Sequence, residues 1–370
     1  MSAPHITHID ICKYRVPFPE PIEFALGRIT HSATIFLRIH ADNGLYGMGE
    51  ASPDPWITGE TQDICFAAAR YLAPHLLGKD PTAVTARTAE IDSLLLHNSS
   101  TRCAFDLALY DLAAKQAGLP LYAYLGGEKR SFVTDFTLWL DTPERMATAA
   151  LAYQQARAVV LKMKVGTSRE DDVARVQAVR AAVGPEMPLR IDANQGWDED
   201  TAVGVLRELV GCNIEFCEQP VAYRDFEALA RVRAQSVIPI MADESLLDQV
   251  DAERLAAMGA CDLFNIKPGK AGGLHNALAI EAIARQAGIS CMVGVFDETR
   301  LALSAYAHFI CARPNILYAD LDSYLVYPDD PISGGVIFDG PHVIVSDTPG
   351  HGADVREDVW ERLEGTVVGG

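Results

Sequence analysis

Positive charge is scarce in this sequence, whose 370 residues include 31 lysines and arginines against 50 aspartates and glutamates. The net charge of −19 argues against a protein that binds nucleic acids or anionic membranes. A small charged substrate is not excluded, because an acidic surface can still enclose a basic pocket. Hydrophobic residues make up 49% of the chain, enough to bury a large core, so we expect one large domain or two ordinary ones.

Long apolar runs are also missing, since no stretch reaches the roughly 18 apolar residues that a membrane-spanning helix needs. The N-terminal segment MSAPHITHIDICKYRVPFPEP lacks the apolar run of a signal peptide. The eight cysteines include no Cys-x-x-Cys pair, and most lie inside apolar runs, which predicts buried free thiols. We therefore expect a cytoplasmic protein that binds neither membranes nor nucleic acids.

The first third of the chain predicts a sheet followed by helices. HITHIDICKYRV and ATIFLRIHADNGLYGMGEAS alternate as strands do, with a turn signal at residues 42–44. After Thr61 the apolar residues follow helical spacing, up to the stop signal Gly118-Leu-Pro120. Residues 1–127 are therefore expected to form an α+β capping domain.

Beyond Ser131, short apolar runs alternate with seven helical segments, a pattern typical of a (β/α)8-type barrel. A doubly wound open sheet would call for a Gly-x-Gly-x-x-Gly loop early in this region, and KVGTS does not match it. We expect the barrel over residues 128–325, and a C-terminal segment, 326–370, that packs back on the cap. The eight strand candidates are DFTLWL, VVLKMKV, LRIDANQ, IEFCEQP, IPIMADES, LFNIKPG, SCMVGVF and ILYADLD.

The ends of these strands carry polar residues that a core strand would not choose. Their spacing is 24 to 28 residues (243 to 267 and 164 to 192 are the extremes), about the length of one βα unit. They should therefore meet at the C-terminal rim, where barrel active sites are built. A single aspartate there could merely cap a helix, but three carboxylates between lysines favour a site. The strand-end residues are Lys164, Asp192, Glu218, Asp243, Lys267, Gly294 and Asp320.

Asp192, Glu218 and Asp243 form an all-oxygen set that suits a hard cation such as Mg2+. Without a cation, three clustered carboxylates would raise one another's pKa values. Asn194 lies two residues beyond Asp192, on the same strand face, and is expected to orient a ligand. Glu244 should point away from the site and have a structural role.

Two lysines, Lys162 and Lys164, are spaced so that both face the barrel mouth, and Lys267 should lie across the barrel from them. A buried lysine beside another cation has a lowered pKa and can act as a base near neutral pH. The alternative for each lysine is a plain ion pair with a carboxylate. Opposed bases around a metal account better for the whole set.

Over essentially its whole length the sequence resembles the muconate-lactonizing subgroup of the enolase superfamily. The resemblance implies one Mg2+ per subunit held by the three carboxylates, Lys164 and Lys267 as the acid/base pair, and Lys162 at the substrate carboxylate. The mandelate-racemase branch would instead have a histidine after the seventh strand, where this chain has GVFDET. The matching motifs are Lys162-Met-Lys164, Asp192-Ala-Asn194, Glu218-Gln-Pro220, Ala242-Asp243-Glu244-Ser245 and Asn265-Ile-Lys267.

Within this subgroup the sequence is most similar to dipeptide epimerases, whose Asp-x-Asp after strand 8 is matched by Asp320-Leu-Asp322. The resemblance implies a dipeptide substrate whose α-ammonium group the two carboxylates hold, which suits a free amine. Alternatively, Asp322 could merely cap a turn. The implied reaction is 1,1-proton transfer at the C-terminal residue's α-carbon through an enediolate. Arg28 and Thr58, in two loops over the site (residues 24–28 and 56–60), and Thr137 are expected at the substrate.

Two departures from these relatives stand out. Pro268-Gly269 follows Lys267, and Phe296-Asp297 ends the seventh strand. A carboxylate at Asp297 would favour a substrate with a cationic side chain, unless it pairs with Arg300 at a helix start.

Other functions stay open at this point. N-succinylamino-acid racemase or o-succinylbenzoate synthase activity would not need Asp320 and Asp322. A muconate-type cycloisomerase is a weaker alternative, and a non-catalytic barrel is a remote one. We also expect a homo-oligomer, while the particular dipeptide is not defined by the sequence.

Overall fold

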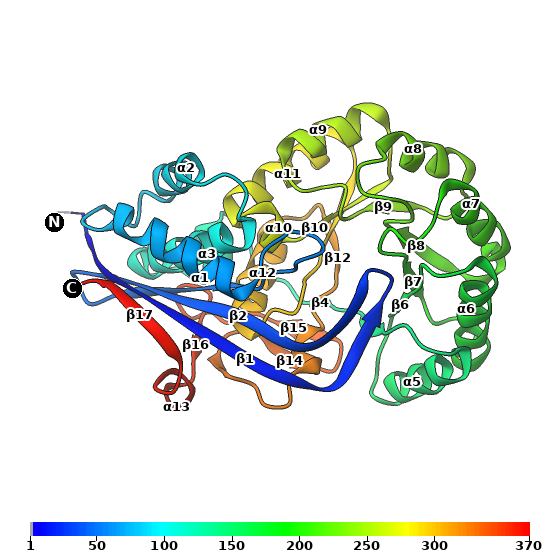
Figure 1. The fold of residues 1–370 in the computed structure, drawn as a ribbon, viewed down its shortest axis with the longest axis horizontal. Coiled ribbons are helices and arrows are strands. Elements are labelled where there is room, and N and C mark those ends of the chain that lie inside the picture. Colours follow the sequence, from blue (N-terminus) through cyan, green and yellow to red (C-terminus); the bar gives the residue numbers. More distant parts are fainter. Residues whose placement is uncertain (1–2) are drawn as a thin grey trace.

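The computed structural model describes residues 3–370 and places a sheet-and-helix cap beside a barrel (Figure 1). The cap sheet has four antiparallel strands in the order β17-β1-β2-β3. Its long hairpin reaches over the barrel, with Phe24 opposite Gly27 at the tip. The four strands are β1 (Ile6–Phe24), β2 (Gly27–Ala41), β3 (Tyr46–Ala51) and β17 (Glu364–Gly369).

Helices cover one face of this sheet, and the longest lies directly on β3. A Cβ at Gly49 would come within 1.9 Å of the Ala104 carbonyl oxygen, so only glycine permits this approach. The same helix ends at Gly118, whose positive φ of 68° makes the left-handed cap that the sequence predicted. The helical elements of the cap are α1 (Gln62–Leu72), η1 (Ala73–Leu76), α2 (Val84–Leu94), α3 (Ser99–Ala117) and α4 (Leu121–Tyr124).

The barrel contains the eight parallel strands that the sequence predicted, paired in chain order from β5 to β12. A hydrogen bond of 3.3 Å from the Asp135 N–H to the Ala319 carbonyl oxygen joins the two end strands, so the sheet curls into a barrel. The strands are β5 (Phe136–Leu138), β6 (Leu161–Lys164), β7 (Leu189–Asp192), β8 (Ile214–Glu218), β9 (Ile240–Ala242), β10 (Leu263–Ile266), β11 (Ser290–Val293) and β12 (Ile316–Ala319).

Helices separate these strands and form the outer layer (Figure 1). Several begin at a side chain that accepts a backbone N–H, as Ser168 and Asp198 do. The unusual Pro268-Gly269 starts a short extra helix, α10, immediately after Lys267. The helices are α5 (Pro143–Gln155), α6 (Arg169–Val183), α7 (Glu199–Glu208), η2 (Val210–Cys212), α8 (Phe226–Gln235), α9 (Gln249–Met258), α10 (Pro268–Ala271), α11 (Leu274–Ala287) and α12 (Arg300–Ala312).

After β12 the chain makes only a short turn and then leaves the barrel. The C-terminal strand β17 pairs with β1, opposite Cys12 and neighbouring residues, so the two ends of the described chain share one sheet. The division at residues 127 and 325 stays a prediction. The elements of this segment are η3 (Ser323–Val326), β13 (Ile332–Gly334), β14 (Ile337–Asp339), β15 (His342–Ile344), β16 (Ala353–Val355) and α13 (Glu357–Trp360), and β4 (Phe132–Val133) pairs with β15.

Two predictions from composition can be compared with the structure. All eight cysteines are buried and free, as expected from their apolar surroundings. Among residues 3–370, no helix combines the length and the apolar character needed to cross a bilayer.

Candidate active site

The parallel pairing of the barrel strands aligns the predicted site residues at one rim. Lys164 is the register partner of Asp192, and Asp192 is the partner of Glu218. Asp243 and Lys267 each follow directly after the last residue of the next two strands. All five side chains are buried, so any charge they carry must be compensated within the site.

Lys162 lies at the centre of the carboxylates. Its Nζ is 2.8 Å from Asp320 Oδ2, 2.9 Å from Glu218 Oε2 and 3.1 Å from Asp192 Oδ2. Lys164 Nζ lies 2.7 Å from the same Asp192 oxygen. The two lysines of the Lys-x-Lys motif therefore face the barrel mouth together, as their spacing predicted.

Lys267 lies on the other side of this cluster, with its Nζ 2.8 Å from Asp243 Oδ2. Three strands, β7 to β9, separate its strand from that of Lys164 in the sheet order. These are the strands that carry or directly precede the three carboxylates of the predicted metal site. The two proposed bases therefore flank that carboxylate set, in agreement with the expected arrangement.

Two polar residues of the site were given no role by the sequence interpretation. Lys270 forms a close ion pair with Asp243 and also donates to the Asn265 carbonyl oxygen at 2.9 Å. The Asn265 side chain donates to Glu218 Oε1 at 2.6 Å. The sequence positions could have predicted both residues at the site. Asn265 is two residues before Lys267 on one strand face, and Lys270 is about one helical turn after Lys267.

The predicted lowering of the lysine pKa values is wrong for Lys162 and Lys267. Burial alone would lower the pKa of Lys162, but Asp320, Glu218 and Asp192 raise it well above its ordinary value. Burial also opposes the charge on Lys267, and Asp243 and Glu218 outweigh it, so its pKa is raised. The lowering effect of Lys162 on Lys267 exists but is smaller than that of the carboxylates.

The carboxylates divide into two groups by pKa. Burial, and then the charge of Asp192, raises the pKa of Glu218 to about 7, as predicted for clustered acids. Asp192 is also buried, but Lys164 and Lys162 lower its pKa to about 2. Lys267 and Lys270 likewise outweigh burial and hold the pKa of Asp243 far below its usual range.

Glu244 does not point away from the site, contrary to the prediction. Its Oε1 accepts a hydrogen bond of 3.2 Å from the Asn194 side chain. Burial and the neighbouring Asp243 raise its pKa to about 8. The backbone turns just after β9, so simple strand alternation does not describe this residue.

The donor atoms of the site fit a hard divalent cation. Two buried oxygens, Asn194 Oδ1 and Glu244 Oε2, accept no hydrogen bond from the described residues, while Glu218 Oε2 and Asp243 Oδ2 face the ammonium groups of Lys162 and Lys267 at 2.9 and 2.8 Å. Carbonyl and carboxylate oxygens are the ligands that Mg2+ prefers. The three predicted ligands do not, however, converge within 4.8 Å of one another, and Lys162 contacts both Asp192 and Glu218.

A second acidic group does converge within 4.8 Å, formed by Asp135, Asp320 and Asp322. Asp322 Oδ2 accepts the Thr137 N–H at 2.6 Å, and Asp322 makes no side-chain cap to η3. The alternative role as a turn cap is therefore wrong. Burial, and then Asp320, raises the pKa of Asp322 to about 7, whereas Arg190 pairs with Asp135 at 2.8 Å.

A cavity of about 990 Å³ lies between the cap hairpin and the barrel. Arg28, Thr137 and Asp322 line it, whereas the three predicted metal ligands and the lysines do not. The exposed Arg28 lies 3.6 Å from Glu23 of its own hairpin. The cavity therefore reaches the site from the side of Asp322.

The two cap loops meet above the barrel. The rings of Phe24 and Trp56 are 5.7 Å apart in an edge-to-face arrangement. Gly27 faces the Trp56 ring so closely that a Cβ there would lie 2.8 Å from it. The Thr58 hydroxyl donates to the Asp54 carbonyl oxygen at 2.9 Å, so this hydroxyl is hydrogen-bonded inside its own loop.

Asp297 faces a smaller cavity of about 210 Å³, which Arg28 and Trp56 also line. Its Oδ1 accepts a hydrogen bond of 2.8 Å from Ser52 of the cap. The alternative pairing with Arg300 is wrong, because that guanidinium binds Asp330 instead. Burial raises the pKa of Asp297 to about 6.

The barrel and its cap, with carboxylates between opposed lysines at the strand ends, define an enzyme of the enolase type. Residues 6–126 match the mandelate racemase / muconate lactonizing enzyme N-terminal domain, and residues 145–359 match the enolase C-terminal domain-like family. The chain belongs to the mandelate racemase / muconate lactonizing enzyme family of the enolase superfamily. It is an isomerase of the epimerase type.

Sequence relatives align with nearly the whole chain. The chain is 41% identical to the D-Ala-D/L-Ala epimerase of Cytophaga hutchinsonii, covering 97% of this chain and 98% of that protein. It is 38% identical to the L-Ala-D/L-Glu epimerase of Bacillus subtilis, covering 94% and 96%. The crystal structure of the Cytophaga hutchinsonii dipeptide epimerase complexed with Mg and D-Ala-L-Val superimposes with a TM-score of 0.97 at 40% identity, over 98% of this chain and 100% of that one.

Proposed function

We propose that the protein is a Mg2+-dependent dipeptide epimerase that inverts the α-carbon of the C-terminal residue. The observation that carries this proposal is the placement of Lys164 and Lys267 on either side of the buried carboxylates. Relatives crystallised with Mg and dipeptides support the substrate class. The cytoplasmic location and the homo-oligomeric state stay predictions.

Asp192, Glu218 and Asp243 would hold the Mg2+, with Asn194 and Glu244 beside them. A cation bound there supplies positive charge that stabilises the doubly negative enediolate form of the substrate. Lys162 adds a second positive charge near the substrate carboxylate. These charges lower the barrier to removing a proton next to a carboxylate, which is otherwise a very weak acid.

The two remaining lysines move the proton. Lys164 and Lys267 lie on opposite faces of the substrate α-carbon, so one removes the proton and the other returns one to the far face. The lysine that accepts must be neutral at that moment and the one that donates must be charged. Phe24 and Trp139 lie about 6 Å from Lys164 Nζ (6.0 and 5.9 Å to the ring centres), and Phe296 lies 5.1 Å from Lys267 Nζ, so the bases are screened from bulk water.

The aspartate pair after β12 defines the other end of the substrate. Asp320 and Asp322 would bind the α-ammonium group of a dipeptide, and the closeness of their oxygens to that of Asp135, within 4.8 Å, supports this role. Such a cluster favours the ammonium group of a dipeptide over the neutral amide that an N-acylated amino acid has at the same position. This difference separates a dipeptide epimerase from an N-succinylamino-acid racemase.

Asp322→Asn should lower kcat/KM for a dipeptide by at least about tenfold and should change kcat/KM for an N-succinylamino acid little. The amide oxygen of the introduced asparagine can still accept the Thr137 N–H, so the loop should keep its shape. Asp320→Asn is expected to act in the same direction, but it also removes a partner of Lys162. Steady-state kinetics on both substrate classes measures the effect.

Ser323→Ala provides a matched control, because its hydroxyl donates to the Glu298 carbonyl oxygen and does not reach the cluster. It should leave the ratio of the two kcat/KM values unchanged. Equal losses for dipeptides and N-succinylamino acids in Asp322→Asn would make the aspartate pair structural and remove the ammonium site from the proposal.

We propose, as a separate point, that Asp297 favours a cationic substrate side chain. Wild type should then prefer Ala-Lys over Ala-Ala and Ala-Glu, and Asp297→Leu should abolish this preference. Because the pKa of Asp297 is about 6, the preference should grow as the pH rises from 5 to 7 and the carboxylate becomes charged. The measurement is kcat/KM for the three dipeptides across this range.

Ser52→Ala is the companion variant, since it removes the hydroxyl that binds Asp297 but keeps the charge. It should retain the order of the three dipeptides. If wild type prefers Ala-Glu, or if Asp297→Leu leaves the order unchanged, Asp297 is not the selector and a preference for small or apolar residues replaces it.

A further inference from the structure

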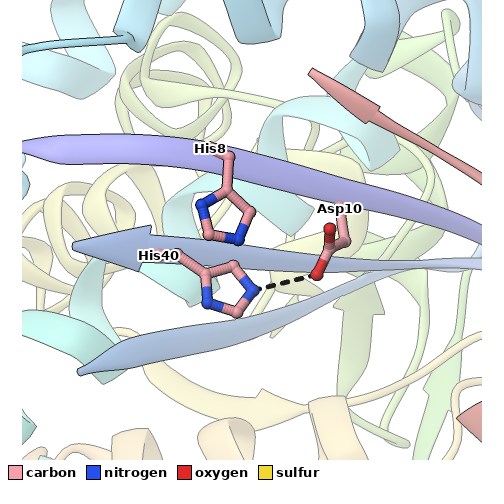
Figure 2. Close-up of side chains that lie close together, drawn as sticks. All are labelled: His8, Asp10 and His40. Atoms are coloured by element: carbon pink, nitrogen blue, oxygen red, sulfur yellow. Dashed lines mark hydrogen bonds and ion pairs between the residues drawn. The ribbon is translucent and has the colours of Figure 1, made fainter. Parts of the chain in front are cut away.

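Three side chains with metal-binding atoms lie together on the cap sheet, outside the barrel site. His8 and Asp10 belong to β1, and His40 is the direct register partner of His8 on β2. Figure 2 shows all three side chains together beside these two strands. They lie on the opposite face from the buried Ile9 and Ile11, and their donor atoms lie within 4.8 Å of one another.

Neighbouring groups contact each of these side chains. The two imidazole rings are stacked with their centres 4.0 Å apart and their planes 11° apart, and His40 Nε2 lies 2.9 Å from Asp10 Oδ2, so one ring has to turn out of the stack for both to bind one ion. Thr7, at a register shift in β1, donates its hydroxyl to the His40 carbonyl oxygen at 3.3 Å. Its oxygen is therefore left to accept from His8 Nδ1 at 3.0 Å, which leaves His8 Nε2 with a free lone pair.

Within residues 3–370, no cation other than His40 pairs with Asp10. Its cross-strand partner Arg38 is bound to Asp354 at 3.2 Å, and the guanidinium lies over the Trp360 ring. Among residues 3–370, the only ion pair of Asp10 is the one with His40. The carboxylate is about one-sixth exposed, at 17%, so solvent reaches the group.

We propose that His8, Asp10 and His40 bind a transition-metal dication of the Zn2+ class. Imidazole nitrogens select such metals over Mg2+, which prefers oxygen ligands. Two nitrogens, one carboxylate oxygen and a water molecule complete a four-coordinate site. Neighbouring ligands of tetrahedral Zn2+ lie about 3.3 Å apart, close to the 2.9 Å between His40 Nε2 and Asp10 Oδ2.

This site would join β1 to β2 near the ends of the hairpin strands remote from the tip at Phe24 and Gly27. A ligand that binds only the folded protein stabilises it by mass action. The metal would therefore raise the melting temperature without entering the chemistry of the barrel.

The test is a Zn2+ titration of the full chain by calorimetry, after chelator treatment and in saturating Mg2+. Zn2+ should bind at the cap site in a one-to-one ratio, and Co2+ should give a visible absorption spectrum with nitrogen ligands. His8→Gln and His40→Gln should each weaken Zn2+ binding by at least about tenfold. Circular dichroism without Zn2+ checks that each variant folds.

Two controls locate the metal. His342→Gln changes an exposed strand histidine elsewhere, and Glu218→Gln changes the barrel, so both should keep the Zn2+ affinity of wild type. The proposal is overturned if His8→Gln and His40→Gln bind Zn2+ as wild type does. It is equally overturned if Glu218→Gln abolishes the binding, since the metal then belongs to the barrel.

Discussion

Lys164→Ala and Lys267→Ala should each lower the epimerisation rate by at least about 100-fold. Each lysine serves one face of the α-carbon, and the carboxylate strands between them prevent one from replacing the other. Their ion pairs, with Asp192 at 2.7 Å and Asp243 at 2.8 Å, hold the two ammonium groups on opposite sides of the site. Chiral chromatography of an Ala-X dipeptide over time measures the rate.

The two variants should also differ in α-proton exchange. In D2O, a variant that keeps one base can exchange the proton of a single stereoisomer without inverting it. Lys79→Ala is the control, because this lysine forms a partly exposed pair with Glu90 far from the rim. The two-base mechanism is wrong if either active-site variant retains turnover near that of wild type.

Glu218→Gln should abolish tight Mg2+ binding and reduce kcat/KM by about 1,000-fold, since a bound cation contributes several kcal/mol to transition-state stabilisation. Glu218 is fully buried and its Oε2 lies 2.9 Å from Lys162 Nζ, so solvent does not replace the lost charge. The amide oxygen of the introduced glutamine can still accept the Asn265 side-chain N–H, which preserves the local packing. Calorimetry with Mg2+ and activity after chelator treatment give the two readouts.

Glu60→Gln is a matched control, because Glu60 is also buried but binds the Ser100 N–H at the start of α3. Its Mg2+ affinity should equal that of wild type. Full activity of Glu218→Gln, or of wild type after complete metal removal, would exclude this carboxylate set as the metal site.

The strand-end residues could be predicted because a parallel barrel brings every C-terminal strand end to one rim. Spacing along the chain was therefore enough to place Lys164 beside Asp192 and Lys267 across from both. The eight strands were predicted from a different signal, the short apolar runs separated by helical segments.

Other features depend on contacts that spacing does not encode. The sequence showed a second lysine near Lys162, but not that three carboxylates would surround it and raise its pKa. It could not show that Asp297 meets Ser52 of the cap, because that contact joins separate parts of the chain. Glu244 was misplaced because strand alternation stops when the strand ends.

Proton exchange at the α-carbon tests the central claim most directly. A dipeptide library is incubated with the protein and Mg2+ in D2O, and loss of the C-terminal residue's α-proton signal is followed by NMR. The account predicts exchange and inversion for at least one dipeptide, lost on chelation and restored by Mg2+. Exchange that persists without metal, or none with any dipeptide while N-succinylamino acids exchange, would contradict it.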